Sequence, residues 1–298
     1  MEPAVAEIVR VLRGSRKYGA LCTETLERVA RWAALRQRTP RAAARAARSK
    51  LHQVYGAYLA SGHWRVLERV QAEMEAVALP VGTAPSQADE IRDCARRVLS
   101  LHASTSERLA FQEQLYPRLL RGLRPAHGAL RVLDLACGLH PFALPWMGLP
   151  VGSEYVAWDI DLRLVAAINR FLDLLGQRGR AEARDLLCGP RALERSERGK
   201  RGERAADDPQ VYREADLVLI LKTLPCLERQ ERDAGVRLLS GLRAQRVVVS
   251  YPARSLGGRE KGMVATYDRQ VHGLAEILGA QVERLEYPTE TFHLFTWP

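Results

Sequence analysis

Three aspartates stand at matching places in the second half of the chain, each near the end of a segment with strand character. Asp134 lies in VLDLA, Asp159 in VAWDI and Asp185 in EARDL. Because open α/β sheets bind ligands beyond the carboxyl ends of their strands, we expect the three carboxylates to meet in one crevice. A single Asp would more simply cap a helix or turn, whereas three in register favour a shared site.

The turn after the first of these strands indicates the ligand. It reads ACG, and Gly138 permits a tight turn with close approach of the backbone. Asp159 follows Gly138 by 21 residues, where an acidic residue accepts hydrogen bonds from both hydroxyls of a ribose. The G-x-G-x-x-G pattern that seats a pyrophosphate is missing, which disfavours NAD. The sequence therefore predicts S-adenosylmethionine (SAM), with Asp185 accepting from the adenine amino group.

The polar segment HASTSER precedes the first strand. Ser104 and Glu107 have the S-x-x-E spacing of a helix capping box, and Arg108 lies one helical turn after Ser104. A guanidinium near a helix N-terminus would favour a carboxylate, such as that of the SAM methionine moiety. A plain N-cap at Ser104 with a surface charge at Arg108 is equally compatible with the spacing.

Lys222 follows the apolar run ADLVLIL and is expected at the mouth of the crevice, where methyltransferases place groups that face the substrate. The N/D-P-P-aromatic sequence that accompanies methylation of exocyclic amines is missing there. Pro225-Cys226 leaves a second chemistry open, in which Cys226 attacks C6 of a cytosine during C5 methylation. A small buried cysteine is the commoner occurrence, so we favour the first chemistry.

The charge of the chain is positive and uneven. The formal net charge is +10, and no Asp or Glu occurs from Arg28 to Leu67. A block of one sign repels itself unless an anion covers it, so we predict a polyanion-binding face, with a solvated helical face as the alternative. The basic residues of this stretch are Arg28, Arg31, Arg36, Arg38, Arg41, Arg45, Arg48, Lys50 and Arg65.

Hydrophobic periodicity predicts helices in the first part of the chain and alternating strands and helices in the second. Helices are expected over 1–78, with breaks at Gly14, Thr39-Pro40 and Ser61-Gly62. Ser86 is a possible N-cap before the next amphipathic helix, 89–101. Further helices are expected over 105–122, 161–176, 228–243 and 262–278. Strands are expected over 130–136, 154–160, 181–186, 215–221, 246–252, 281–287 and 293–297. This order predicts a largely parallel sheet covered on both faces and closed by an antiparallel hairpin. The segment 189–210 is predicted to be a charged, flexible loop.

Composition excludes globally disordered, collagen-like and fibrous proteins. Hydrophobic residues make up 47% and charged residues 27%, as in globular domains. The five cysteines form no C-x-x-C pair and the histidines no cluster, so we expect neither disulfides nor a metal site. Neither a signal peptide nor a membrane span is recognisable, and we expect a cytoplasmic protein.

Four segments together resemble the Arm family of aminoglycoside-resistance methyltransferases: HASTSERL, LDLACGLHPFALPWM, WDID and LKTLPCLERQ. The resemblance runs from about residue 60 to the C-terminus, without 189–210. It implies a Rossmann-like class I SAM methyltransferase sheet of seven strands in residues 106–298, preceded by an all-helical basic rRNA-binding domain in residues 1–105. It also implies methylation of N7 of a guanine in the 16S rRNA decoding site of the assembled 30S subunit. Separately, we expect a monomer.

The resemblance further implies the roles of individual residues. Lys222 and Glu228 would face the substrate or support the catalytic site, and Trp64 would be an aromatic lid over the cofactor. The expected SAM-binding residues are Trp64, His102, Ala103, Ser104, Arg108, Ala136, Gly138, Asp159, Ile160, Asp185, Leu186, Leu221 and Gln230.

The expected chemistry is mostly positioning. Guanine N7 carries a free lone pair, so no general base is needed, and the enzyme must hold N7 in line with the methyl–sulfur bond. A base in a structured helix must also be flipped out. Two alternatives of other kinds stay open: a ribosome-binding module that uses SAM without transfer, and a methyltransferase for small molecules, which leaves the acid-free basic stretch unexplained.

Overall fold

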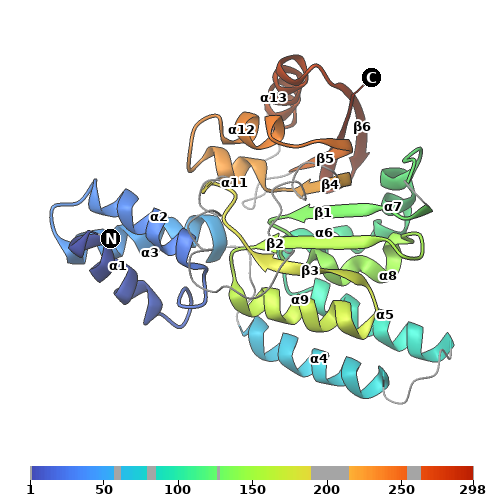
Figure 1. Ribbon diagram of the computed structural model, residues 1–298, viewed down its shortest axis with the longest axis horizontal. Coiled ribbons are helices and arrows are strands. Elements are labelled where there is room, and N and C mark those ends of the chain that lie inside the picture. The colour runs from blue at the N-terminus through green and yellow to red at the C-terminus, as the bar shows by residue number, and fades with distance from the viewer. Residues whose placement is uncertain are drawn as a thin grey trace, which may run out of the picture.

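The computed structural model describes residues 2–56, 62–78, 85–125, 128–188, 215–253 and 263–297. The predicted loop 189–210 lies outside the described residues, as does Ser61. The described part consists of one mixed sheet with helices on both faces, and a group of helices beside it (Figure 1).

The sheet has seven strands in the order β3-β2-β1-β4-β5-β7-β6. The first five run parallel, and β7 pairs antiparallel with both β5 and β6, which confirms the closing hairpin. The strands are β1 (Arg131–Leu135), β2 (Glu154–Asp159), β3 (Arg178–Ala183), β4 (Ala215–Leu221), β5 (Ala244–Pro252), β6 (Gln281–Tyr287) and β7 (Glu290–Thr296).

Alternate residues of the central strands point into two separate cores. Val132 of β1 packs in a core with residues of α4 (His63–Ala78), α5 (Pro85–Leu99), α7 (Gln112–Leu120) and α9 (Leu162–Leu174). The next residue, Leu133, packs in a second core with α11 (Leu224–Glu228), α12 (Ala234–Ser240) and α13 (Met263–Leu278). This alternation is what a sheet buried on both faces requires, and the two helical layers are visible in Figure 1.

The first helices form a unit with a core of its own. It contains α1 (Pro3–Arg13), α2 (Thr23–Ala34), α3 (Pro40–Leu51) and a π-helical turn, η1 (His52–Gly56). The predicted breaks at Gly14 and at Thr39 are confirmed, and the Thr39 side chain accepts a hydrogen bond from Ala42 N at the start of α3. We call α1, α2, α3 and η1 the helical unit. Helices α4 and α5 pack instead with the sheet.

The expected strand 181–186 is wrong by three residues. The strand found, β3, lies at the edge of the sheet, and most of its side chains are exposed or half-buried, so it carries no apolar pattern. It also contains Gly179, with a φ of 120°, where any Cβ would collide with the Tyr155 carbonyl. Glycine is rare inside strands, so Gly179 gives the sequence no indication that a strand runs through it.

Two expected helices are each divided in the structure. The stretch 228–243 contains the end of α11 and all of α12, because Asp233 takes a left-handed φ of 59° between them. The stretch 105–122 contains the end of α6 (Ala103–Arg108) and all of α7, which are separated at Phe111. Finally, α5 begins at Pro85, so Ser86 is not its N-cap.

Candidate active site

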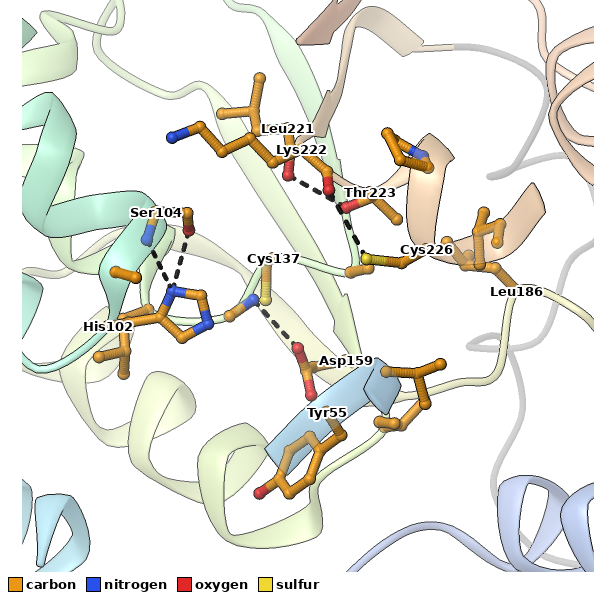
Figure 2. Close-up of a pocket in the computed structure, with 18 of the residues that line it drawn as sticks. Tyr55, His102, Ser104, Cys137, Asp159, Leu186, Leu221, Lys222, Thr223 and Cys226 are labelled. Carbon is orange, nitrogen blue, oxygen red and sulfur yellow. Dashed lines mark hydrogen bonds between the residues drawn. The ribbon is translucent and has the colours of Figure 1, made fainter. Parts of the chain in front are cut away.

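A cavity of about 760 Å³ opens at the carboxyl ends of the strands. Its wall is formed by the segments after β1, β2, β3 and β4 together with residues of α2, η1, α4, α6 and α13 (Figure 2). All of the residues that the sequence predicted for the site line this cavity, including the pair Lys222 and Glu228. The three aspartates also meet here, as their positions in the strands led us to expect.

Asp159 lies at the end of β2 and is 9% exposed. Its Oδ2 accepts from Gly138 N and its Oδ1 from Asp161 N, both at 3.0 Å. Burial raises the pKa of this carboxyl to about 6, although the backbone donors act in the opposite direction. Each oxygen keeps a second lone pair, so the carboxylate can accept from two ligand hydroxyls.

The turn that directly follows β1 contains two residues with left-handed backbone conformations. Gly138 has a φ of 54° and Ala136, before it, a φ of 51°. The Gly138 conformation turns its N–H towards the Asp159 carboxylate. A non-glycine residue in this region costs energy, and strain of this kind collects at ligand sites.

Asp134 lies within β1, one residue before its end, and is 1% exposed. Its Oδ2 accepts from Tyr155 OH at 2.6 Å and from His140 Nδ1 at 2.8 Å. Its Oδ1 is buried and finds no hydrogen-bond partner within the described part of the chain. A buried, unpartnered carboxylate oxygen is costly, so its place in the cavity wall suits a ligand that donates a hydrogen bond.

Arg108 is the last residue of α6, not near its N-terminus as the sequence suggested. Its Nε and Nη2 each donate to one oxygen of Glu290 at 2.8 Å, and the two side chains are 3% and 0% exposed. The Ser250 hydroxyl also donates to Glu290. The guanidinium therefore lines the cavity already bound to a carboxylate, and Nη1 takes no part in that pair.

His102 is the N-cap of α6, so the predicted capping box of Ser104 and Glu107 is wrong. His102 Nδ1 accepts from Ser104 N at 3.2 Å and lies 2.9 Å from Ser104 Oγ. Burial, followed by the nearby charges of Arg108 and Lys222, lowers the pKa of His102 to about 4. The imidazole is therefore neutral at physiological pH and can accept at Nδ1.

Lys222 follows β4 with a left-handed φ of 56°. Its Nζ pairs with Glu107 and lies 3.4 Å from Glu290 Oε2. Glu107, expected in the capping box, thus contributes to the mouth of the cavity. Cys226 also lines the cavity, and its Sγ lies 3.4 Å from Arg229 Nη2.

Glu228 has a structural task that its sequence position did not reveal. Its carboxylate accepts from Asp233 N at 3.0 Å and from Gly235 N at 2.6 Å. These bonds satisfy backbone donors at the start of α12. Glu228 therefore holds the α11–α12 turn, which is a supporting role for the cavity wall.

The helical unit contributes side chains to the cavity wall that the sequence did not assign to the cofactor site. Thr25 and Arg28 of α2 both donate to Asp185, and Tyr55 of η1 donates to Asp161. Trp64 lies at the start of α4, lines the cavity and has the Arg163 guanidinium 4.2 Å from its ring centroid. Within the helical unit, only the acid-free charge pattern pointed to a function, and it pointed to an anion rather than to the cofactor. Trp64, which lies outside this unit, was the residue expected as an aromatic lid over the cofactor.

The remaining predicted residues come from the same segments. Ala103 lies at the start of α6, Ile160 follows β2, and Leu221 ends β4. Leu186 follows Asp185, and Gln230 follows α11, where its Nε2 donates to Cys226 O at 3.2 Å. No group of His, Cys, Asp and Glu suited to a metal occurs among the described residues. No described helix is long and apolar enough to span a membrane.

The sheet order, the closing hairpin and the crevice lined by Asp159 and Asp134 define a class I SAM-dependent methyltransferase. The chain matches the FmrO family, described as "Ribosomal RNA methyltransferase", over residues 14–197 and 205–294. It belongs to this family.

Relatives and solved structures agree with this placement. The chain is 36% identical to a 16S rRNA (guanine(1405)-N(7))-methyltransferase of Frankia casuarinae, with 98% of this chain and 94% of the relative covered. A protein of the same name from Micromonospora echinospora is 33% identical, with 98% and 97% covered. The crystal structure of the 16S rRNA methyltransferase RmtF in complex with S-adenosyl-L-homocysteine (SAH) superposes with a TM-score of 0.75 at 31% identity, covering 100% of both chains.

Proposed function

We propose that this protein transfers the methyl group of SAM to N7 of guanine 1405 in 16S rRNA, as the names of its relatives state for them. The observation that carries the proposal is the cavity, which joins the acidic crevice of a SAM methyltransferase to a basic helical unit. The likeness to the relatives extends over both parts of the chain.

The cavity wall fits the parts of SAM. Asp159 would accept from the two ribose hydroxyls, and Asp185 from the adenine amino group. The unpartnered Oδ1 of Asp134 suits a donor of the methionine moiety, and Arg108 Nη1 suits its carboxylate. SAM supplies an electrophilic methyl group when bound. The roles of the other predicted lining residues follow from their place in the same wall.

The chain's own residues would position the base. Guanine N7 needs no deprotonation, so orientation of its lone pair is the main requirement. The neighbouring O6 is an acceptor on the same base edge, and Lys222 Nζ at the cavity mouth can donate to it. Glu107 and Glu290 lie beside Lys222 and offset the positive charge of its ammonium group. Lys222 therefore repels the guanine less when methylation makes the base cationic.

The helical unit would dock on the small ribosomal subunit. Helix α3 buries Ala43, Ala47 and Leu51 in the core of the unit and exposes Arg45 and Arg48. Exposed arginines of this kind bind phosphates and make affinity fall steeply with salt. We place the boundary of this unit between η1 and α4, because α4 and α5 share the core of the sheet. A cytoplasmic monomer acting on the assembled 30S subunit suits this arrangement.

Methylation would protect the ribosome against aminoglycosides. N7-methylguanine is cationic and lacks an acceptor at N7, so a polycationic drug loses a hydrogen bond and meets repulsion, each worth about 1–3 kcal/mol.

Cys226 supports one alternative, an RNA cytosine-C5 methyltransferase, because its thiol lies in the cavity wall. The two functions differ in the atom that receives the methyl group and in their need for this thiol.

The proposal is tested with SAM that carries a labelled methyl group. We expect the label to enter 16S rRNA of intact 30S subunits, and we expect Asp159→Ala to abolish the transfer. A variant with Arg45→Ala and Arg48→Ala should lose rRNA affinity while it binds SAM normally. Label in a small molecule alone, or in no RNA, would contradict the proposal.

A further inference from the structure

We propose that Thr25 and Arg28 of α2 are positioning residues for SAM binding, because they hold Asp185 in the wall of the cavity. The inference rests on the proposed function, in which Asp185 accepts from the adenine amino group. It assigns to the helical unit a share in cofactor recognition, in addition to its proposed contact with rRNA.

Both side chains donate to one oxygen of Asp185. Thr25 Oγ1 lies 2.8 Å from Oδ2, Arg28 Nε lies 2.9 Å from it, and Arg28 Nη2 lies at 2.9 Å as well. Thr25 is fully buried, and the side chains of Asp185 and Arg28 are 4% and 18% exposed. A carboxylate so far from water needs such partners, since an unpaired buried charge is costly.

The other oxygen of Asp185 is thereby oriented. Oδ1 accepts from the backbone N–H of Leu187 at 2.9 Å, and a carboxylate oxygen has room for a second donor. With Oδ2 fixed by α2 and Oδ1 by the chain after β3, the carboxylate plane cannot rotate freely. Asp185 and Arg28 both line the cavity, so the arrangement prepares an acceptor for an amino group.

Helix α2 is itself fastened beside the ribose end of the cavity. Just before α2, Cys22 N donates to Ile160 O at 2.8 Å, and Leu162 N donates to Ala20 O at 2.9 Å. These bonds make a short antiparallel bridge between Leu21 and the residue after Ile160. The bridged segment directly follows Asp159, so the position of α2 is fixed relative to both Asp159 and Asp185.

Arg28 also contacts the part of the cavity wall that follows α11. Its Nη1 donates to Gln230 Oε1 at 3.1 Å, so one guanidinium joins the chain after β3 to the chain after α11. Two residues that the family resemblance assigns to SAM, Asp185 and Gln230, are thus connected through a residue of the helical unit. A change in α2 should therefore be felt first in cofactor binding.

The experiment is calorimetric titration of the full-length protein with SAH. Thr25→Val keeps the shape of the buried side chain and removes only the hydroxyl donor, and Arg28→Met removes the guanidinium. We expect each to weaken SAH binding by about tenfold or more, as loss of a hydrogen bond to a charged group does. Thr25→Ser should restore affinity. The matched control is Arg31→Met on the same helix, because Arg31 is exposed and pairs with the half-exposed Glu27, and it should bind as wild type does.

A second titration separates positioning from mere stability. S-inosyl-L-homocysteine carries a carbonyl oxygen in place of the adenine amino group and would meet the Asp185 carboxylate unfavourably. The wild-type protein should prefer SAH, and Thr25→Val and Arg28→Met should reduce that preference. A purely structural role would lower the melting temperature and leave the ratio of the two affinities unchanged.

Three results would overturn the inference: wild-type SAH affinity in both variants, an equal loss of affinity for both ligands, or no preference in the wild-type protein. Each of these is read from binding alone. Methyl transfer to 30S subunits by the wild-type protein is measured separately, so a failure of the proposed function would be recognised independently.

Discussion

Removing one partner of the buried pair of Arg108 and Glu290 should destabilise this protein more than breaking an exposed ion pair. Its side chains are 3% and 0% exposed and meet through two hydrogen bonds of 2.8 Å. Glu290→Ala would leave the guanidinium in the core without its carboxylate. Breaking a buried pair from one side costs about 3–5 kcal/mol. We therefore expect the free energy of unfolding to fall by about that amount.

The assay is denaturant unfolding, together with a thermal melt. In a domain of this size about 1 kcal/mol corresponds to about 2–4 °C, so the midpoint should fall by about 6–20 °C. The control is Glu73→Ala, which removes the partner of Arg97 in a pair whose side chains are 41% and 46% exposed. Solvent screens that pair, and its loss should change the unfolding free energy far less.

A double replacement distinguishes the charge effect from loss of packing. Arg108→Met combined with Glu290→Leu removes both charges and should be more stable than Glu290→Ala alone. Equal destabilisation by Glu290→Ala and Glu73→Ala, or a double variant less stable than Glu290→Ala, would refute the reasoning.

Three further predictions concern the cavity. Burial raises the pKa of Asp159 to about 6, and ribose hydroxyls favour its charged form. SAH affinity, measured by titration, should thus be constant above about pH 7 and fall by up to tenfold per pH unit below about pH 6. Asp159→Asn should abolish this pH dependence. An SAH affinity that rises on acidification would contradict the prediction. Lys222→Met should lower kcat by about ten- to hundredfold with little change in SAM affinity, as single-turnover kinetics and SAM titration would show; an unchanged kcat would exclude a contact to O6. Cys226→Ser should retain full methyl transfer, and its inactivation would favour the covalent alternative.

Two strands were predicted with the bounds that the structure has, one in the middle of the sheet and one at its edge. The strands β4 (215–221) and β6 (281–287) have the predicted bounds. For β4 the reason is its position in the middle of the sheet, where both faces are covered and every residue but Asp216 is apolar. The edge strand β3 carries no such pattern, and there the expected strand was wrong.

The location of the site could be predicted because it depends on the order of the strands along the chain. Asp134 and Asp159 are close to the ends of successive parallel strands, and the topology alone brings them to one edge. The partners of the site residues depend on tertiary packing. Glu290 is 182 positions from Arg108, and Thr25 is 160 positions from Asp185. No spacing rule relates residues that far apart, so these contacts needed the structure.

The central claim is tested most directly by mapping the modified nucleotide. 30S subunits are incubated with the protein and SAM, and their 16S rRNA is analysed by mass spectrometry and primer extension. The account predicts one new N7-methylguanine, at position 1405, in the wild-type reaction and none with Asp159→Ala. Methylation at a cytosine C5, at another guanine, or in no nucleotide of the 30S subunit would contradict it.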